Sequence, residues 1–328
     1  MEKKERLTAP GGLKRTLLSY NSAVILVVLL IIGSFFISRF TRNFSTIVFE
    51  SSLYGCIAVG LALVMVTGNI DLSVGFQAAT SAVLVVLVIN ATGSVLAGVL
   101  AALAAGLVMG AINGFTVTKL GISPLIATIA TNYIYKGIVY YFTKDGSIYP
   151  ADDLRNALRN NIARLQFGGS KYLALTVILF AAILILLAFV MRKTAFGNHL
   201  YIAGDNAEAG KLAGINTNRT AFFAYVLCGF LCGLAGVFLA SNQGAAIYTL
   251  GEGRDVFAIS ACVIGGIKMA GGKGTMLNVL IGVLIMRLIS TAMNLLLIPA
   301  AWVDFVSGLL LIVVLIIDRL TSGEDAKA

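Results

Sequence analysis

Long apolar runs alternate with short polar connections over nearly all of the 328 residues of the chain. An α-helix needs about 20 apolar residues to cross the hydrocarbon core of a bilayer. Several runs approach that length, and we predict spanning helices at residues 20–38, 47–67, 76–92, 95–118, 124–142, 171–191, 221–241, 255–269, 275–297 and 301–318. The pattern therefore predicts an all-α polytopic membrane protein with about ten transmembrane helices.

The composition favours a membrane protein over a soluble enzyme. Hydrophobic residues make up 59% of the chain and charged residues 12%, whereas an ordinary soluble domain carries about 25% charged residues. The mean hydropathy of +0.94 over the whole length requires several lipid-facing segments, because a single buried core would not produce it.

The positions of the charges predict the orientation of the chain. Basic residues precede the first apolar run at Lys3, Lys4, Arg6, Lys14 and Arg15. Because Lys and Arg concentrate in cytoplasmic segments, we predict cytoplasmic tails at residues 1–19 and 319–328, in a bacterial inner membrane. The net charge of +9 is thus explained by topology, and nucleic acid is not an expected partner. Arg39 and Arg42 fall outside in this topology and run against the rule.

Two polar connections stand out by length within the predicted membrane domain, residues 20–318. Residues 143–170 carry charges of both signs and are predicted to face the exterior, where a soluble partner could dock. Residues 192–220 form the longest cytoplasmic connection. Within it, Ala207–Leu212 are good helix formers, and Gly214 is placed to end a short helix that would fit a cleft in a partner.

Small residues recur at helical spacing in two of the predicted spans. They are Gly98, Ala102, Gly106, Gly110 and Gly114 in one span, and Gly229, Gly233, Gly236 and Ala240 in another. Lipid supplies no hydrophobic force between helices, so small residues that allow close backbone approach are typical of helix–helix interfaces. We interpret both stripes, and the neighbouring Cys228 and Cys232, as packing surfaces.

Two places interrupt the apolar pattern with glycine and a charge, at residues 67–75 and 264–275. They lie at similar positions in the two halves of the chain, which predicts an internal pseudo-repeat with broken helices. Irregular backbone at membrane depth persists only where protein or a water-filled cavity satisfies its polar groups. We therefore expect these segments to line a pathway.

Two charges inside apolar runs need partners or functions, because a charge in the membrane is costly. Asp71 could cap, together with Ser73, the helix that begins near Val74, and this role is compatible with lining a pathway. Arg287 could pair with Asp71 or Asp304, bond backbone carbonyls, or face a wet cavity.

Four stretches carry a family resemblance: Asn69–Gly75, Gly110–Gly114, Glu208–Asn216 and Ala270–Gly274. In chain order they resemble the motifs G-G-I-D-L-S-V-G, G-x-x-N-G, N-E-A-A…G-I-N and S-L-A-G-G-x-G. These motifs belong to the permeases of ribose- and galactose-type sugar ABC importers, which include subunits for xylose, arabinose and autoinducer-2. The resemblance covers about residues 45–318. Departures occur at Asn69, Phe257, Lys268, Asn278 and Arg287, and they would also suit one half of a heterodimeric permease pair.

The resemblance implies a permease that works as a pair, a homodimer or a heterodimer. Two ATPase subunits would bind on the inside, and a periplasmic or lipid-anchored solute-binding protein would bind on the outside. The residues expected to engage the ATPase are Asn206, Ala207, Glu208, Ala209, Gly210 and Gly214. The chain has no G-x-x-x-x-G-K-[ST] motif, since Lys273 precedes Gly274, so ATP and Mg are expected to be used by the partner.

A polar solute that crosses by alternating access needs hydrogen-bonding groups along its way. The candidates in the translocation pathway are Asn69, Asp71, Ser73, Gln77, Asn113, Asn132 and Arg287. The resemblance favours a monosaccharide as the solute. A nucleoside, a vitamin or autoinducer-2 is the alternative within the same superfamily.

Two other classes compete with an importer subunit. An ion-coupled secondary transporter would use Asp71 and Arg287 as a coupling pair, but few ionisable groups lie in the predicted spans. An intramembrane enzyme is disfavoured because the sequence shows no nucleophile–base pair and no metal-ligand cluster. We therefore expect no catalytic residue, no metal and no cofactor in this chain.

Overall fold

The structure, a computed structural model, describes residues 21–36, 40–166 and 171–325. The long helices of the bundle are α3 (Asn21–Phe36), α4 (Phe44–Val66), α5 (Val74–Thr92), α6 (Val95–Thr118), α7 (Pro124–Thr143), α9 (Leu175–Lys193), α12 (Thr217–Gln243), α14 (Met276–Leu295) and α15 (Ala300–Asp325). The shorter elements are η1 (Thr41–Asn43), β1 (Ser147–Ile148), α8 (Asp152–Leu158), η2 (Arg159–Ala163), η4 (Lys171–Leu173), α10 (Ala195–Asp205), α11 (Ala207–Leu212), β2 (Ala246–Ile247), η5 (Tyr248–Gly251) and α13 (Arg254–Gly265).

The polytopic all-α class is confirmed, whereas the number of spans is not. Within the described residues, six helices are long and apolar enough to cross a membrane: α4 together with η1, α5, α6, α9, α12 and α14. Shorter apolar helices run over Ser22–Phe35 and Ala301–Val313, inside α3 and α15. Among the described residues, each predicted run contains a helix, but α13 has only 12 residues, which is about 18 Å of helix and too short to span.

Helix α12 lies in the centre of the bundle and packs against α4, α5 and α6. The central part of the predicted small-residue stripes forms the interface between α6 and α12, whereas Gly98 and Gly236 pack against α5. A Cβ atom added to Gly229 would lie 2.7 Å from Gly110 Cα, and one added to Gly233 would lie 2.8 Å from Ala102 O. A side chain at these glycines would push the two helices apart, so the stripes are packing surfaces as predicted.

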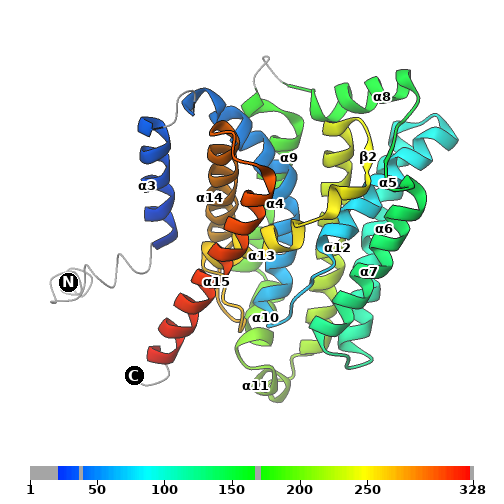
Figure 1. Ribbon diagram of the computed structural model, residues 1–328. Helices are drawn as coiled ribbons and strands as arrows, with labels where there is room; N and C mark the ends of the chain where they lie inside the picture. The colour runs from blue at the N-terminus through cyan, green and yellow to red at the C-terminus, as the bar shows by residue number, and fades with distance from the viewer. Residues whose placement is uncertain (1–20, 37–39, 167–170, 326–328) are drawn as a thin grey trace.

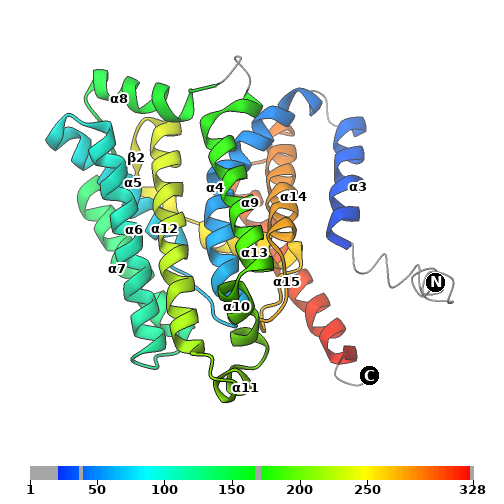
Figure 2. The same cartoon turned by 180° about the vertical axis from the view of Figure 1, so that it is seen from behind.

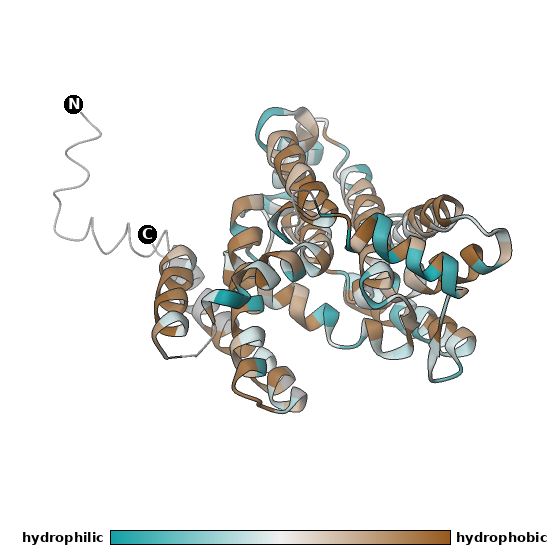
Figure 3. Cartoon of the chain, turned by 90° about the horizontal axis from the view of Figure 1, so that it is seen from above, coloured by the Kyte–Doolittle hydropathy of each residue, from teal (hydrophilic) through white to brown (hydrophobic). Residues whose placement is uncertain are grey.

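Apolar side chains cover the outside of the bundle as well as its interior. Leu96, Val108, Tyr133, Ile134, Ile185 and Phe189 are all more than half exposed. Seen from above, the helices are largely brown, and teal residues form short stretches between them (Figure 3). Such an exterior suits lipid, because a soluble protein rarely exposes large continuous apolar patches.

The two ends of the bundle differ in their elements. Helix α8 lies at one end and α11 at the other, as Figures 1 and 2 show from opposite sides. At the α8 end, β1 pairs antiparallel with β2, with Ser147 opposite Ile247. The Asn21 end of α3 and the carboxyl-terminal end of α15 both lie toward the α11 end.

Candidate translocation and coupling site

The first broken segment, Thr67–Ser73, connects α4 with α5 and leaves the helical path at Gly68, whose φ is +76°. The Thr67 hydroxyl donates to Val64 O, and the Asn69 amide donates to Thr67 Oγ1 over 2.9 Å. Some polar groups of the turn are therefore paired by hydrogen bonds within the turn itself.

Asp71 lies at the centre of a buried hydrogen-bond network with Ser73, Gln77 and Asn113, and all four side chains are fully buried. Ser73 donates to Asp71 Oδ1 through its backbone N–H (2.9 Å) and its hydroxyl (2.6 Å). Gln77 Nε2 and Asn113 Nδ2 donate to Asp71 Oδ2 over 2.9 and 3.0 Å. The carboxylate is thus compensated by four neutral donors, as a buried charge requires.

We call Asp71, Ser73, Gln77 and Asn113 the Asp71 network. The side-chain cap that the sequence suggested for α5 is not formed. Ser73 occupies the N-cap position of α5, but its hydroxyl donates to Asp71 and makes no cap hydrogen bond. Asn113 belongs to α6, so the network joins the start of α5 to the neighbouring helix.

Two further helices hold the first broken segment. The Leu72 backbone N–H donates to Thr128 Oγ1 of α7 over 3.1 Å, and Tyr225 OH of α12 donates to Ile70 O over 2.9 Å. Side chains from α6, α7 and α12 therefore supply the hydrogen bonds that an interrupted helix leaves open, as backbone at membrane depth requires.

The second broken segment, Gly266–Gly274, connects α13 with α14. Its turns need glycine, because the φ values of Gly266, Gly271 and Gly272 are +97°, +89° and +72°. Tyr201 OH of α10 donates to Gly274 O over 2.8 Å. Burial raises the pKa of Tyr201, so the phenol keeps the proton that it donates.

Both broken segments and the end of α10 meet at four glycines, Gly68, Gly204, Gly271 and Gly272, which we call the glycine junction. The Gly272 N–H donates to Val66 O over 2.9 Å. A Cβ on Gly271 would lie 2.6 Å from Gly68 N and 2.9 Å from Gly204 Cα, and a Cβ on Gly204 would overlap Val66 O. The paired segments that the sequence singled out are therefore in direct backbone contact.

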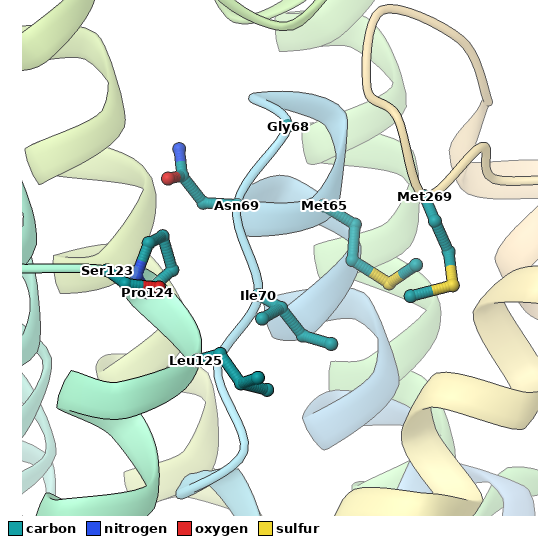
Figure 4. Close-up of a pocket in the computed structure, with 8 residues that line it drawn as sticks. All are labelled: Met65, Gly68, Asn69, Ile70, Ser123, Pro124, Leu125 and Met269. Atoms are coloured by element: carbon teal, nitrogen blue, oxygen red, sulfur yellow. The ribbon is translucent and has the colours of Figure 1, made fainter.

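A cavity of about 300 Å³ lies between the two broken segments and the start of α7. It is lined by Met65, Gly68, Asn69, Ile70, Ser123, Pro124, Leu125 and Met269. Figure 4 shows the side chains of Met65 and Met269 pointing toward one another across it. Asn69 is the only predicted pathway residue that lines this cavity, since the Asp71 network is buried behind it.

Helix α11 occupies the segment for which the sequence predicts a short helix. Asn206 caps it, with its side chain accepting from Ala209 N over 2.9 Å, and Gly214 follows it with a φ of +80°. Ala207, Glu208 and Ala209 are exposed, Gly210 is buried, and Leu212 is 92% exposed. Helix α11 thus presents an almost fully exposed leucine at the tip of the bundle.

The exposed helix and the glycine junction share a cavity of about 480 Å³. It is lined by Tyr201, Ile202, Asp205, Asn206, Ala209, Gly210, Ala213, Ile215, Gly272 and Lys273. Gly204 is separated from the Asn206 cap by one residue, so α11 begins next to the glycine junction.

Arg287 has a partner that the sequence analysis did not consider. Its guanidinium forms an ion pair with Glu50 of α4 and lies 4.8 Å from the centre of the Tyr54 ring. Asp71 instead accepts from Ser73, Gln77 and Asn113, and Glu50 is the partner of Arg287 because α14 packs beside α4. The side chain of Asp304 lies outside the described residues. Arg287 thus takes part in an ion pair, and pairing with a carboxylate was one of the hypotheses that the sequence left open.

Asn132 and several charged residues complete the comparison with the sequence. Asn132 is half-buried in α7 and lies outside both the Asp71 network and the cavity lining. The sequence analysis did not identify Lys136, Glu252 or Arg254, although Lys136 interrupts a predicted apolar span. Lys136 Nζ lies 3.9 Å from Glu252 Oε1, and the Arg254 guanidinium lies 4.4 Å from the Tyr54 ring centre.

Broken helices around a cavity, a buried polar network and an exposed terminal helix define a polytopic membrane permease. The chain belongs to the family described as "Branched-chain amino acid transport system / permease component", whose family model matches residues 43–315. The resemblance to ABC importer permeases is thereby confirmed.

Curated relatives agree with this family. The chain is 35% identical over 297 residues to the autoinducer 2 import system permease protein LsrC of Yersinia pestis (strain Pestoides F), covering 90% of this chain and 82% of the relative. It is 36% identical over 300 residues to the protein of the same name from Escherichia coli (strain SMS-3-5 / SECEC), covering 90% of this chain and 86% of the relative. No solved structure matches the chain.

Proposed function

We propose that this chain is the membrane-spanning subunit of an ATP-binding-cassette importer that moves a small polar solute inward by alternating access. The observation that carries the proposal is the glycine junction, which puts the end of α10, next to α11, in contact with both broken segments. The solutes to test first are autoinducer-2, which the names of the relatives specify, and a monosaccharide.

The ATPase partner would bind at the α11 end of the bundle. Leu212 offers an exposed apolar side chain, and Glu208 and Lys211 flank it with charges of both signs. An apolar centre with a polar rim is the usual composition of a protein interface. ATP and Mg would be bound and used in that partner, because the sequence of this chain contains no phosphate-cradling motif.

The proposed cycle turns closure of the ATPase dimer into movement of the broken segments. Displacement of α11 would move Gly204. Because Gly204 has no side chain, its backbone lies directly against Val66 and Gly272, and these residues would move with it. The ATPase can bias the transporter only through its different affinity for the two conformations. The cavity beside Asn69 would open and close toward the inside as the second broken segment shifts.

In this assignment the α11 end and both termini are cytoplasmic, and the α8 end faces the exterior. The described part of the polar segment, residues 143–166, lies toward the α8 end, and the segment 143–170 would meet a periplasmic or lipid-anchored solute-binding protein. Arg155 there lies over the Tyr149 ring, and partial burial with Arg164 and Arg155 nearby lowers the pKa of Arg159. Clustered arginines suit acidic residues on such a partner. A second permease copy, identical or different, would complete the pathway.

The test is co-purification of the tagged permease with its ATPase from membranes. Leu212→Asp is expected to reduce co-purification at least tenfold, because it places a charge at the centre of the apolar contact. Leu297→Asp is the matched control, since Leu297 is 89% exposed but follows α14 near the other end of the bundle. Equal recovery of the ATPase with both variants would overturn the coupling assignment, and solute uptake by the permease alone in proteoliposomes would indicate a secondary transporter.

A further inference from the structure

The turn before α13 brings charged residues to the middle of the membrane. Tyr54 lies ten residues from the start of α4 and twelve from its end, which is about 15–18 Å along the helix in either direction. The Arg254 guanidinium lies 4.4 Å from the centre of the Tyr54 ring. Since α4 is one of the membrane-spanning candidates, Arg254 and the nearby Glu252 lie near the middle of the bilayer.

A second set of contacts ties this turn to α7. Lys136 Nζ lies 3.9 Å from Glu252 Oε1, and Tyr140 OH donates to the same carboxylate oxygen over 2.9 Å. The Lys136 ammonium also lies 5.6 Å from the centre of the Phe76 ring. We call Lys136, Tyr140, Glu252 and Arg254 the charged cluster. Figure 1 shows the yellow segment that carries Glu252 crossing the middle of the bundle from β2 to α13.

The charged cluster is partly exposed, unlike the Asp71 network. The side chains of Glu252 and Lys136 are 46% and 35% exposed. A charge at this depth is too costly to face hydrocarbon, and such charges face water-filled cavities or protein. The exposed side of the cluster therefore faces either a wet pathway or a partner subunit.

The chemistry of the cluster favours a wet pathway that carries a neutral hydroxylated solute. The ammonium and guanidinium groups donate hydrogen bonds, the carboxylate accepts them, and the Tyr140 hydroxyl can do both. The charges of Lys136 and Arg254 are balanced by Glu252 and by the neighbouring Asp255. A balanced set of donors and acceptors beside aromatic rings matches a polyol or sugar ring better than an ion.

We propose that Lys136, Glu252 and Arg254 line the water-filled pathway at mid-membrane depth and contact a neutral, hydroxylated solute in transit. This inference rests on the proposed function and deepens it, because it assigns a solute-contact site that lies apart from the cavity beside Asn69. Specificity in the membrane subunit would then depend on this cluster, while the Asp71 network holds the helices that surround it.

The test uses an introduced thiol and a membrane-impermeant, water-soluble thiol reagent on the full transporter in membrane vesicles. The four native cysteines, Cys56, Cys228, Cys232 and Cys262, are fully buried, so the background is low. Glu252→Cys is expected to react at least tenfold faster than Ile134→Cys, a control on α7 that is 59% exposed toward lipid. Lys136→Cys repeats the measurement from α7. Equal rates at all three positions would overturn the pathway assignment.

Solute contact is tested by protection of the Lys136→Cys thiol. D-ribose, D-galactose or autoinducer-2 is expected to slow its modification at least threefold, whereas a sugar phosphate is not. Protection by the sugar phosphate alone, or by none of the four, would overturn solute contact. These measurements need no ATP hydrolysis and use no Leu212 variant, so they can fail or succeed independently of the Leu212→Asp co-purification experiment.

Discussion

Thr67–Ser73 is held by side chains from three neighbouring helices, whereas Gly266–Gly274 is held mainly by backbone hydrogen bonds. The first segment includes Asp71, which accepts four hydrogen bonds in a fully buried network. In the second, Lys268 N donates to Lys273 O, and Gly272 N donates to Val66 O. Both arrangements satisfy polar backbone at membrane depth, but side chains from three helices hold the first segment, whereas the Tyr201 hydroxyl of α10 is the side-chain donor that reaches the second at Gly274 O. The first is therefore suited to stay in place, and the second to move against it.

The largest expected effect comes from removing the acceptor at the centre of the first segment. Asp71→Leu leaves the backbone N–H and the hydroxyl of Ser73 buried without an acceptor, whereas Gln77 and Asn113 still donate to Ser73 Oγ. Each unpaired group costs about 1–3 kcal/mol. We expect the free energy of unfolding in detergent to fall by about 4 kcal/mol. Asp71→Asn, which keeps one acceptor oxygen, should lose clearly less. Equal losses for the two variants would contradict the role of the acceptor oxygens and would show that the side chain at position 71 stabilises the fold through packing alone.

A smaller effect is expected where the two segments touch. Gly204→Ala introduces a methyl group that would overlap Val66 O, and forcing extra volume into packed structure costs about 1–3 kcal/mol. The midpoint of thermal unfolding in detergent and the rate of ATP-driven uptake should both fall. Gly137→Ala in α7 is the control, since nothing lies within 4 Å of an added Cβ there, and it should stabilise by about 0.5–1 kcal/mol. If Gly204→Ala changed neither stability nor uptake, the contact at Gly204 would not link the movements of the two segments.

Single hydrogen bonds to the first segment should have smaller effects still. Tyr225→Phe removes the hydroxyl that donates to Ile70 O, and a typical hydrogen bond contributes about 1 kcal/mol. Tyr133→Phe on the lipid-facing side of α7, where Tyr133 is 68% exposed, should change stability by less than about 0.5 kcal/mol. Chemical denaturation of both variants provides the measurement, and a larger loss for Tyr133→Phe would contradict the anchoring role of α12.

The smallest effect is expected in the second segment. Lys273 is exposed at its edge, so Lys273→Ala should change the free energy of unfolding by no more than about 0.5 kcal/mol. A loss comparable to that of Asp71→Asn would show that side chains also hold this segment. The comparison would then fail, because the two segments would be equally fixed.

The helices were largely predictable because apolar runs of membrane length have few other uses. The interruptions near Asp71 and Gly271 were also visible, since a charge or paired glycines inside an apolar run contradict a continuous helix. The short helix Ala207–Leu212 followed from its composition and from Gly214. These features depend on neighbours in sequence, which is why the sequence alone reveals them.

Contacts between distant segments could not be predicted. Arg287 pairs with Glu50, a residue more than 200 positions away at the start of α4, and no local pattern selects Glu50 over Asp71. Gly204 looks like an ordinary loop glycine until α10 is placed against Val66. Lys136 could have been noticed as a charge inside an apolar span, but its partner Glu252 becomes visible only in the fold. The cavity beside Asn69 likewise depends on Met269 from the other half of the chain.

The two-residue strands at the α8 end restrict which parts of the bundle can separate. Ser147 pairs with Ile247, and the amide of Asn90 both donates to Tyr149 O and accepts from Ala151 N. These hydrogen bonds join the ends of α5, α7 and α12 at the α8 end of the bundle into one block. Spin labels at positions 147 and 247 would keep a constant separation throughout turnover, and any outward-opening hinge has to run along the border of this block.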